Sequence, residues 1–127
     1  MADKADKKAG KTSTQHELVA CDLEFPRVQK EMAELEIAQL EQFEESVNKI
    51  QRMTWDQIYK TSSKRQKRGI NWEPIEGQET ASGRKIASIR ISEKFRARVC
   101  RDGRFMRFIS LHPDHDSAYA EWGGEEV

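Results

Sequence analysis

The sequence predicts an α+β domain in which an N-terminal strand and a pair of helices pack on a small, twisted antiparallel sheet. Two observations carry this prediction. Residues 27–53 are rich in Glu, Gln, Ala and Leu and contain neither Gly nor Pro, a composition that favours helix. Three later runs, KIASIRIS, FRARVCR and RFMRFISLH, alternate apolar with polar residues, as half-buried strands do.

Length and composition set the limits of such a domain. The 127 residues fit one unit, and a hydrophobic content of 36% against a charged content of 35% implies a modest core under a heavily charged surface. We expect residues 1–16 to form a disordered polar arm, residues 17–122 to form the single domain and residues 123–127 to be a tail.

No run approaches the roughly 18 apolar residues that span a bilayer, and the first residues lack the apolar stretch of a secretory signal. The sequence therefore predicts a cytoplasmic protein without a membrane partner. The two cysteines, Cys21 and Cys100, lie far apart without metal-ligand spacing, so we expect reduced thiols.

The first elements follow from local signals. Residues 18–25, LVACDLEF, predict a short strand, and Pro26 begins a long helix at a position where its missing N–H costs nothing. Thr54 and Gln57 have the spacing of a capping box, which predicts a second, short helix. The long helix has two offset apolar stripes, which predict a bend or break near Ile37. They are Val28, Met32 and Leu35, then Leu40, Phe43, Val47 and Ile50.

Between the short helix and the strand-like runs, the sequence indicates irregular structure. Residues 62–69, SSKRQKRG, are a polar, basic loop. Pro74 argues against a central strand in the stretch that follows, so Ile70, Trp72 and Ile75 contribute an edge at most.

The second and third runs are joined by Asp102-Gly103, a strong signal for a two-residue type I′ turn. Because a two-residue loop sets the register, we expect Arg98 opposite Arg107. One face of the sheet is then apolar and suits the long helix. It carries Phe95, Ala97, Val99, Met106 and Phe108.

The other face is predicted to carry Arg96, Arg98 and Arg107, with Arg90 joining them from the preceding strand. Like charges that face one another across a strand pair are destabilising, so the arginines indicate a negatively charged partner. Rigid guanidinium groups interleaved with aromatic rings suit the phosphates and bases of RNA. The alternative is a solvated face whose arginines pair with nearby carboxylates.

The formal net charge is zero, but the charges are separated along the chain. Residues 17–50 contain nine acidic and three basic residues, whereas residues 84–107 contain nine basic and two acidic ones. Local patches of this kind steer polyanions. The alternative is that the acidic helix lies across the basic sheet and cancels its charge.

The chain after the last strand, LHPDHDSAY, holds two of the three histidines, His112 and His115. Histidine titrates near neutral pH, which suits proton transfer. Cleavage of RNA by its own 2′-hydroxyl needs a base, an acid and cations that stabilise the phosphorane. A His/Tyr tail beside an arginine face supplies these without a metal. Alternatively, Asp114 or Asp116 caps a short C-terminal helical turn, with Tyr119 packed on the body.

Over residues 17–119 the chain resembles the RelE/ParE superfamily of bacterial toxins. The likeness rests on the order of a strand, a helix pair and three antiparallel strands, and on the motifs K-I-A-S-I-R-I, F-R-A-R-V, R-F-I-S-L and D-H-D-S-A-Y. It implies a RelE-like fold and the toxin of a type II toxin–antitoxin system. Such a toxin is an endoribonuclease that cleaves mRNA, free or on the ribosome, inhibits growth and is neutralised by a cognate antitoxin.

The resemblance also implies roles for single residues. His115, four residues before Tyr119, matches the closing His and aromatic of a YafQ-like branch, which implies a general acid or base with a tyrosine that stacks on or orients the substrate. Arg96 matches a phosphate-binding arginine, and Arg90 matches the basic residue of the strand before it. Further RNA contacts are expected at Arg98, Arg107, Lys85, Arg104 and His112. We expect no metal and no other cofactor.

Two other functions stay open. A branch of this superfamily inhibits gyrase without cutting RNA. The Lys-x-Lys pair of the family is also missing from the first sheet strand of this chain, which leaves room for a non-catalytic module that binds RNA or a protein.

Overall fold

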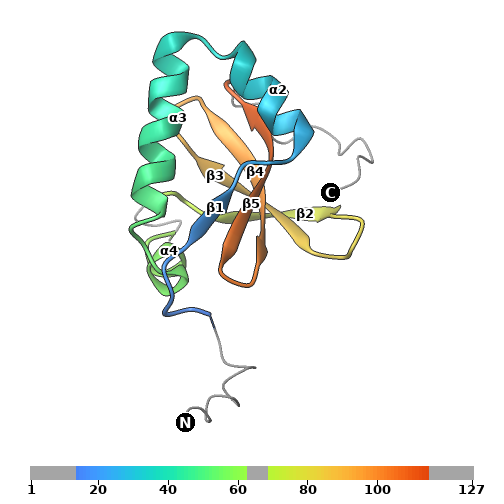
Figure 1. Ribbon diagram of the computed structural model, residues 1–127. Helices are drawn as coiled ribbons and strands as arrows, with labels where there is room; N and C mark the ends of the chain where they lie inside the picture. Colours follow the sequence, from blue (N-terminus) through green and yellow to red (C-terminus); the bar gives the residue numbers. More distant parts are fainter. Residues whose placement is uncertain (1–13, 63–68, 115–127) are drawn as a thin grey trace.

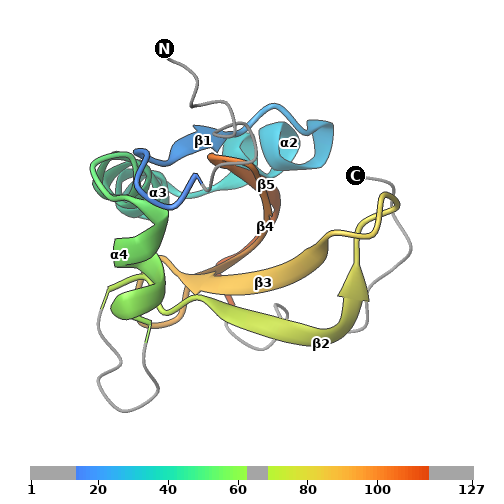
Figure 2. The same cartoon turned by 90° about the horizontal axis from the view of Figure 1, so that it is seen from below.

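The computed structural model describes residues 14–62 and 69–114. Its elements are β1 (Ala20–Asp22), α2 (Pro26–Glu34), α3 (Ile37–Ile50), α4 (Trp55–Lys60), β2 (Glu73–Glu79), β3 (Lys85–Arg90), β4 (Arg96–Asp102) and β5 (Phe105–His112) (Figure 1). The strands form one sheet in the order β1-β5-β4-β3-β2, and Figure 2 shows its strong curvature. The α+β class is confirmed. The predicted C-terminal helical turn lies outside the described residues.

The sheet is mixed, which corrects the prediction of an antiparallel sheet. β1 pairs with β5 in parallel, with Asp22 opposite Arg107, whereas the β2–β3, β3–β4 and β4–β5 pairs are antiparallel. A parallel pair needs a long connection, and here α2, α3, α4 and three strands separate β1 from β5 in the chain. The predicted N-terminal strand is therefore present, and it runs in the same direction as the last strand.

The helices begin and break where the sequence predicts, and the long apolar-striped stretch ends at Ile50, before the predicted end near Met53. The long apolar-striped stretch breaks at Leu35 and Glu36, which both have extended backbone, and Glu36 forms a capping box with Gln39 that begins α3. The predicted capping box of α4 is also present. The Thr54 hydroxyl accepts a hydrogen bond from the Gln57 amide at 3.2 Å, and the Thr54 amide donates to the Gln57 side chain at 2.9 Å.

The core lies between α3 and the face of the sheet that the sequence predicts for it. Phe43 of α3 is fully buried. Its ring centroid lies 6.3 Å from that of Phe95 and 5.5 Å from that of Phe108, the second pair being edge to face. Other buried members of this core are Val19, Val28, Ile50, Trp55, Ile58, Ile70, Ala87, Ile89, Ala97, Val99, Met106 and Leu111.

The predicted register of the β4–β5 hairpin is wrong. Asp102 pairs with Phe105, so the two turn residues are Gly103 and Arg104. Gly103 has a φ of +63°, and Arg104 does not have positive φ, which fits a type II′ turn rather than type I′. The carboxylate of Asp102 bonds arginines on two other strands, so this residue belongs to β4.

The register shifts once more between Val99, which pairs with Phe108, and Arg98, which pairs with Ser110. Ile109 is thus an extra residue on β5, a β-bulge. The bulge turns Leu111 into the core beside Ala97.

Residues 73–79 form a full edge strand, where the sequence predicted irregular structure with at most an edge contribution from Ile70, Trp72 and Ile75. β2 lies at the edge of the sheet, and Pro74 is paired with Ala87 of β3. Proline is tolerated at an edge because the missing N–H would point away from the sheet. The pairing is interrupted between Pro74 and Glu79, and Gly77 in this interval has a φ of +80°.

The longer helix of the acidic segment, α3, does not cover the arginines. α3 packs on the core face through Phe43 and Ile50. Successive strand residues point to opposite faces, so Arg96 and Arg98 point away from the core that contains Ala97. For α3, this arrangement contradicts the alternative in which the acidic helix lies across the basic sheet and cancels its charge. In the described ranges, each helix is too short or too polar to cross a membrane.

The described chain begins with residues that already contact the domain. The carbonyl oxygen of Gln15 accepts a hydrogen bond from the Asp56 amide at 3.0 Å, and the Thr14 hydroxyl accepts one from Arg101 at 2.5 Å. Residues 1–13 of the predicted arm lie outside the described residues.

Candidate nucleic-acid interface

The face of the sheet opposite α3 carries the predicted arginines in two groups. At one end of β3, β4 and β5, Arg90, Arg96 and His112 are directly paired across the strands, and Arg98 lies in the next row between two serines. We call Arg90, Arg96, Arg98 and His112 the sheet-end cluster. Arg107 lies on the same face nearer the β4–β5 turn, opposite Cys100.

A small apolar cluster divides the two groups. Ile86, Cys100 and Ile109 are fully buried together, with Ile75 and Phe25 packed against them. Ile109 is the bulge residue, and it follows Arg107 by two positions. The sequence predicted Arg98 directly opposite Arg107, whereas in the observed register Arg98 lies opposite Ser110 and Arg107 lies opposite Cys100.

Arg90 and Arg96 differ in their bonding. Nη1 of Arg96 donates to the carbonyl oxygens of Ser92 at 2.6 Å, Glu93 at 3.1 Å and Phe95 at 3.3 Å, which closes the β3–β4 turn. Arg90 stands opposite Arg96, and its Nε is buried without a hydrogen-bond acceptor. A buried donor without an acceptor costs about 1–3 kcal/mol. An anionic ligand would therefore gain most at Arg90.

His112 and Arg98 lie beneath the surface, with 6% and 2% of their areas exposed. Burial, followed by the charges of Arg98 and Arg27, lowers the pKa of His112 to about 4. Its Nε2 lies 2.7 Å from the hydroxyl oxygen of Ser110. His112 is therefore uncharged at neutral pH, and any contact that it makes with RNA is a hydrogen bond rather than an ion pair.

The lowered pKa predicts that His112 makes the fold sensitive to acid. Between pH 6.5 and about 4 the unfolded chain binds a proton that the native ring does not, so stability falls as pH falls. From pH 7.5 to pH 5 this residue should remove roughly 2 kcal/mol of unfolding free energy. His112→Gln, which can keep a hydrogen bond to Ser110, should lose correspondingly less. Urea unfolding of both proteins at the two pH values measures the difference, and parallel losses would contradict the prediction.

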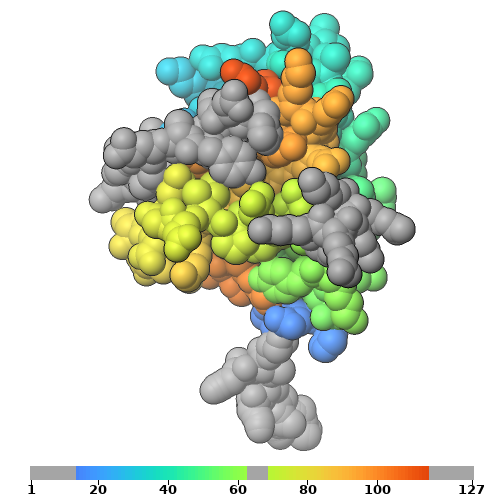
Figure 3. All heavy atoms as spheres, turned by 180° about the vertical axis from the view of Figure 1, so that it is seen from behind, coloured from blue at the N-terminus to red at the C-terminus, as the bar shows by residue number. Residues whose placement is uncertain are grey.

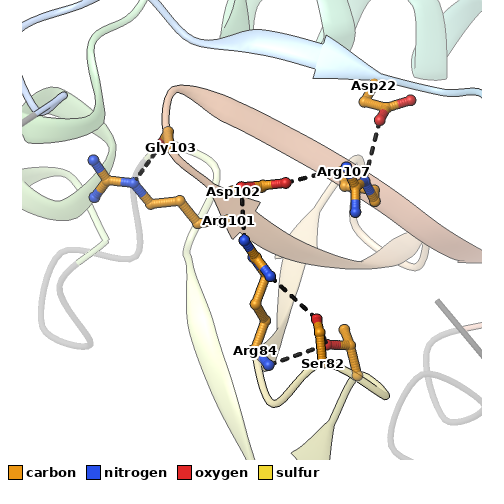
Figure 4. Close-up of polar contacts among 8 residues, drawn as sticks. Asp22, Ser82, Arg84, Arg101, Asp102, Gly103 and Arg107 are labelled. Carbon is orange, nitrogen blue, oxygen red and sulfur yellow. Dashed lines mark hydrogen bonds and ion pairs between the residues drawn. The ribbon is translucent and has the colours of Figure 1, made fainter.

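Arg107 belongs to a row of alternating charges that crosses the sheet (Figure 4). It bonds Asp22 at 3.1 Å and Asp102 at 3.2 Å, and Asp102 also bonds Arg84 at 2.8 Å. The hydrogen bond that Arg107 donates to the Asp22 carboxylate is the main cause that raises the pKa of Arg107. For this arginine, the structure agrees with the alternative of pairing to nearby carboxylates.

Lys85 and Arg104, the other predicted RNA contacts, lie away from the sheet-end cluster. Lys85 is exposed at the start of β3, and within the described ranges its ammonium group has no ion-pair partner. Arg104 lies in the β4–β5 turn with its guanidinium 5.6 Å from the ring centroid of Phe105, which is 45% exposed. Both residues remain accessible to a ligand.

A group of aromatic rings beside Arg101 was not predicted. Trp55, Tyr59 and Trp72 contact one another with centroids 5.2 to 5.8 Å apart. The Arg101 guanidinium lies 4.5 Å from the Trp55 ring centroid and donates to the Tyr59 hydroxyl at 3.0 Å. The spacing of Trp55 and Tyr59 by four positions on one helix face is the sequence signal for part of this group. The position of Trp72 depends on the fold.

His115 and Tyr119, the predicted acid–base group and stacking residue, lie outside the described residues. In residues 14–62 and 69–114, no three His, Cys, Asp or Glu side chains are placed to hold a metal ion. Cys21 and Cys100 are free thiols. Burial raises the pKa of both, that of Cys21 to about 12, so neither is a nucleophile at neutral pH.

The mixed five-stranded sheet with helices on one face defines an α+β domain with a cationic end. No family model matches the chain, and no curated protein or solved structure gives a significant match.

Proposed function

We propose that this protein is the toxin of a type II toxin–antitoxin system, an endoribonuclease that cleaves mRNA without a metal, free or on the ribosome. The sheet-end cluster carries the proposal. It contains two opposed arginines, and the Nε of Arg90 is buried without an acceptor. Like charges directly opposed across a strand pair are destabilising, and a phosphodiester would accept a hydrogen bond from the unsatisfied Nε of Arg90 in a geometry that guanidinium groups bind well. The order of a first strand, helices and antiparallel strands also supports the resemblance to RelE/ParE toxins.

In this proposal the scissile phosphate lies on Arg90 and Arg96, and the buried charge of Arg98 adds to the positive potential. A base removes the proton of the 2′-hydroxyl, and the 2′ oxygen attacks the phosphorus. The bond from phosphorus to the 5′ oxygen breaks as an acid protonates that oxygen. The products are a 2′,3′-cyclic phosphate and a 5′-hydroxyl. His115, the residue after the last described one, acts as acid or base, and Tyr119 stacks on or orients the substrate.

One observation favours a second function, RNA binding without cleavage. Arg98 and His112 are buried, which takes two predicted contacts away from the surface. In either case a cognate antitoxin, or another acidic partner, is expected to neutralise the protein by covering the sheet-end cluster.

Arg90→Gln tests the function most cleanly in cells. Induction of the parent should arrest growth and fragment mRNA, and Arg90→Gln should lower cleavage by about 10²-fold, the usual cost of one donor that stabilises developing negative charge. Because Arg90 opposes Arg96 and has an unsatisfied Nε, its replacement should leave the urea midpoint unchanged or slightly raised. Mapping of transcript ends, together with urea unfolding, separates lost cleavage from lost folding.

Lys49→Gln is the matched control, since it removes one exposed charge from α3 on the other side of the molecule. It should arrest growth as the parent does. Fragmentation by Arg90→Gln at the parent's rate would contradict the proposal. Intact transcripts with a DNA-damage response would indicate a gyrase-directed toxin, and bound but uncut RNA would indicate the binding module.

A further inference from the structure

A cavity of about 270 Å³ lies between α4, the chain just before β2, the start of β3 and the end of β4. Two aromatic rings, Tyr59 and Trp72, line it together with three cations, Arg84, Lys85 and Arg101, and three apolar residues of β2 and β3. In Figure 3, seen from behind, residues of α4 (green) and β2 (yellow-green) adjoin on one face of the molecule. The cavity is at the opposite end of β3 from Arg90.

The Tyr59 and Trp72 rings of the cavity are held in place by the buried ring of Trp55. Trp55 is fully buried, and its centroid lies 5.6 Å from that of Tyr59 and 5.2 Å from that of Trp72. Tyr59 and Trp72 meet edge to face at 82°, and the Trp72 amide donates to the Ser62 hydroxyl at 2.7 Å. Because the rings are already ordered, a ligand that stacks on them incurs little entropy cost from the protein.

The charges around the cavity favour an anion. Arg84 has further N–H donors besides those that bond Ser82 and Asp102. The Arg101 guanidinium lies over the rings of Trp55 and Tyr59. Lys85 is exposed and has no ion-pair partner within the described part of the chain. Among the described residues that line the cavity, none is a carboxylate.

Size and shape narrow the ligand further. Cavities for drug-sized ligands measure about 300–1,000 Å³, so a cavity of about 270 Å³ suits a smaller planar group, such as one nucleobase. Stacking on aromatic side chains and ion pairs to phosphate are how proteins hold single-stranded nucleic acid. The larger cavity of about 490 Å³ beside β1 includes Asp22 and Glu24, and their charges repel phosphate.

We propose that this cavity binds one unpaired base of an RNA strand, with the adjoining phosphate on Lys85 and Arg84. The inference rests on the proposed function, because the same strand is expected to cross the sheet-end cluster. Ile86, at the cavity, and Arg90 are four residues apart on β3, about 13 Å at the usual rise of a strand. A base held in the cavity therefore selects which neighbouring phosphate reaches Arg90, and the cavity contributes to the choice of cleavage position.

The test measures the binding of a fluorescein-labelled single-stranded 2′-O-methyl RNA of about ten nucleotides by fluorescence anisotropy. The 2′-O-methyl groups prevent cleavage. Tyr59→Ala should weaken binding by about 5- to 150-fold, the equivalent of one stacked base, and Tyr59→Phe should restore most of the loss. Lys85→Gln should lower the salt slope by about 0.7, and Lys49→Gln should not change it.

A set of RNAs that each lack one base locates the contact. For the parent, removal of the base at one position of the strand should weaken binding. For Tyr59→Ala, removal of the same base should cause no further loss of affinity. Equal affinity of Tyr59→Ala, Lys85→Gln and the parent for RNA would overturn the inference. A second probe, a labelled peptide that contains Glu and Tyr, tests for a protein ligand instead. If Tyr59→Ala and Lys85→Gln weaken binding of this peptide but not of RNA, the inference is also overturned.

Cleavage assays on the same variants separate the two proposals. If Arg90→Gln abolishes cleavage and the cavity variants bind and cut RNA as the parent does, only the inference fails. If the cavity variants weaken RNA binding but no protein cuts RNA, the inference stands and the proposed catalysis fails. If the parent binds no RNA, both fail.

Discussion

Replacement of His115 by alanine is expected to slow RNA cleavage by about 10²- to 10⁴-fold, the usual contribution of a general acid or base. In the proposed mechanism His115 moves a proton and does not carry the phosphate, so the affinity for RNA should change by only a few-fold. His112 does not replace it, because burial lowers the pKa of His112 to about 4 and leaves the ring unprotonated at neutral pH. Single-turnover cleavage and anisotropy on the same RNA measure both quantities.

His16→Ala is the matched control for this prediction. His16 is the third histidine of the chain and is exposed before β1. Its replacement should leave cleavage at the parent's rate. If His115→Ala also cleaves at that rate, the acid–base role of His115 is wrong, and catalysis would have to be assigned to another group.

Replacement of Phe43 by alanine is expected to lower the free energy of unfolding by about 3–5 kcal/mol. The ring is fully buried, and it contacts both Phe95 and Phe108 across the interface of α3 with the sheet. Aromatic pairs add about 0.5–1.5 kcal/mol beyond the area that they bury. Domains of this size are stable by about 5–15 kcal/mol, so the variant should be partly unfolded at moderate urea concentrations.

Ile37→Ala provides the control on the same helix, because Ile37 is 79% exposed. Its effect should stay within about 0.5 kcal/mol. Urea unfolding followed by circular dichroism compares the three proteins. Similar midpoints for Phe43→Ala and the parent would show that α3 does not hold the sheet through this ring.

The sequence predicted the helices better than the strand register, for a physical reason. Capping boxes and apolar stripes are local, so the break before Ile37 and the start of α4 at Thr54 followed from neighbouring residues. The β4–β5 register depends on Asp102, whose carboxylate bonds Arg84 and Arg107. These ion pairs favour a turn at Gly103 and Arg104. Because they join different strands, the residues around the turn do not predict them.

The sequence predicted which side of the sheet carries the arginines, but not that they form two separate groups. The alternation of β3 and β4 was enough to place Arg90 and Arg96 on one side. The bulge at Ile109 and the ion pairs of Arg107 with Asp22 and Asp102 come from packing between strands that are distant in sequence. The same is true of the cavity beside Tyr59 and Trp72, which α4 and the chain before β2 complete only in the folded domain.

The most direct test of the central claim is cleavage of one RNA that contains, or lacks, a single 2′-hydroxyl at the mapped cut. The purified protein is assayed with and without ribosomes. The account predicts fragments that end in a 2′,3′-cyclic phosphate and a 5′-hydroxyl, and no cleavage of the 2′-deoxy RNA even though it binds equally well. Cleavage at the deoxy position, fragments with a 5′-phosphate, or no cleavage under either condition would contradict it.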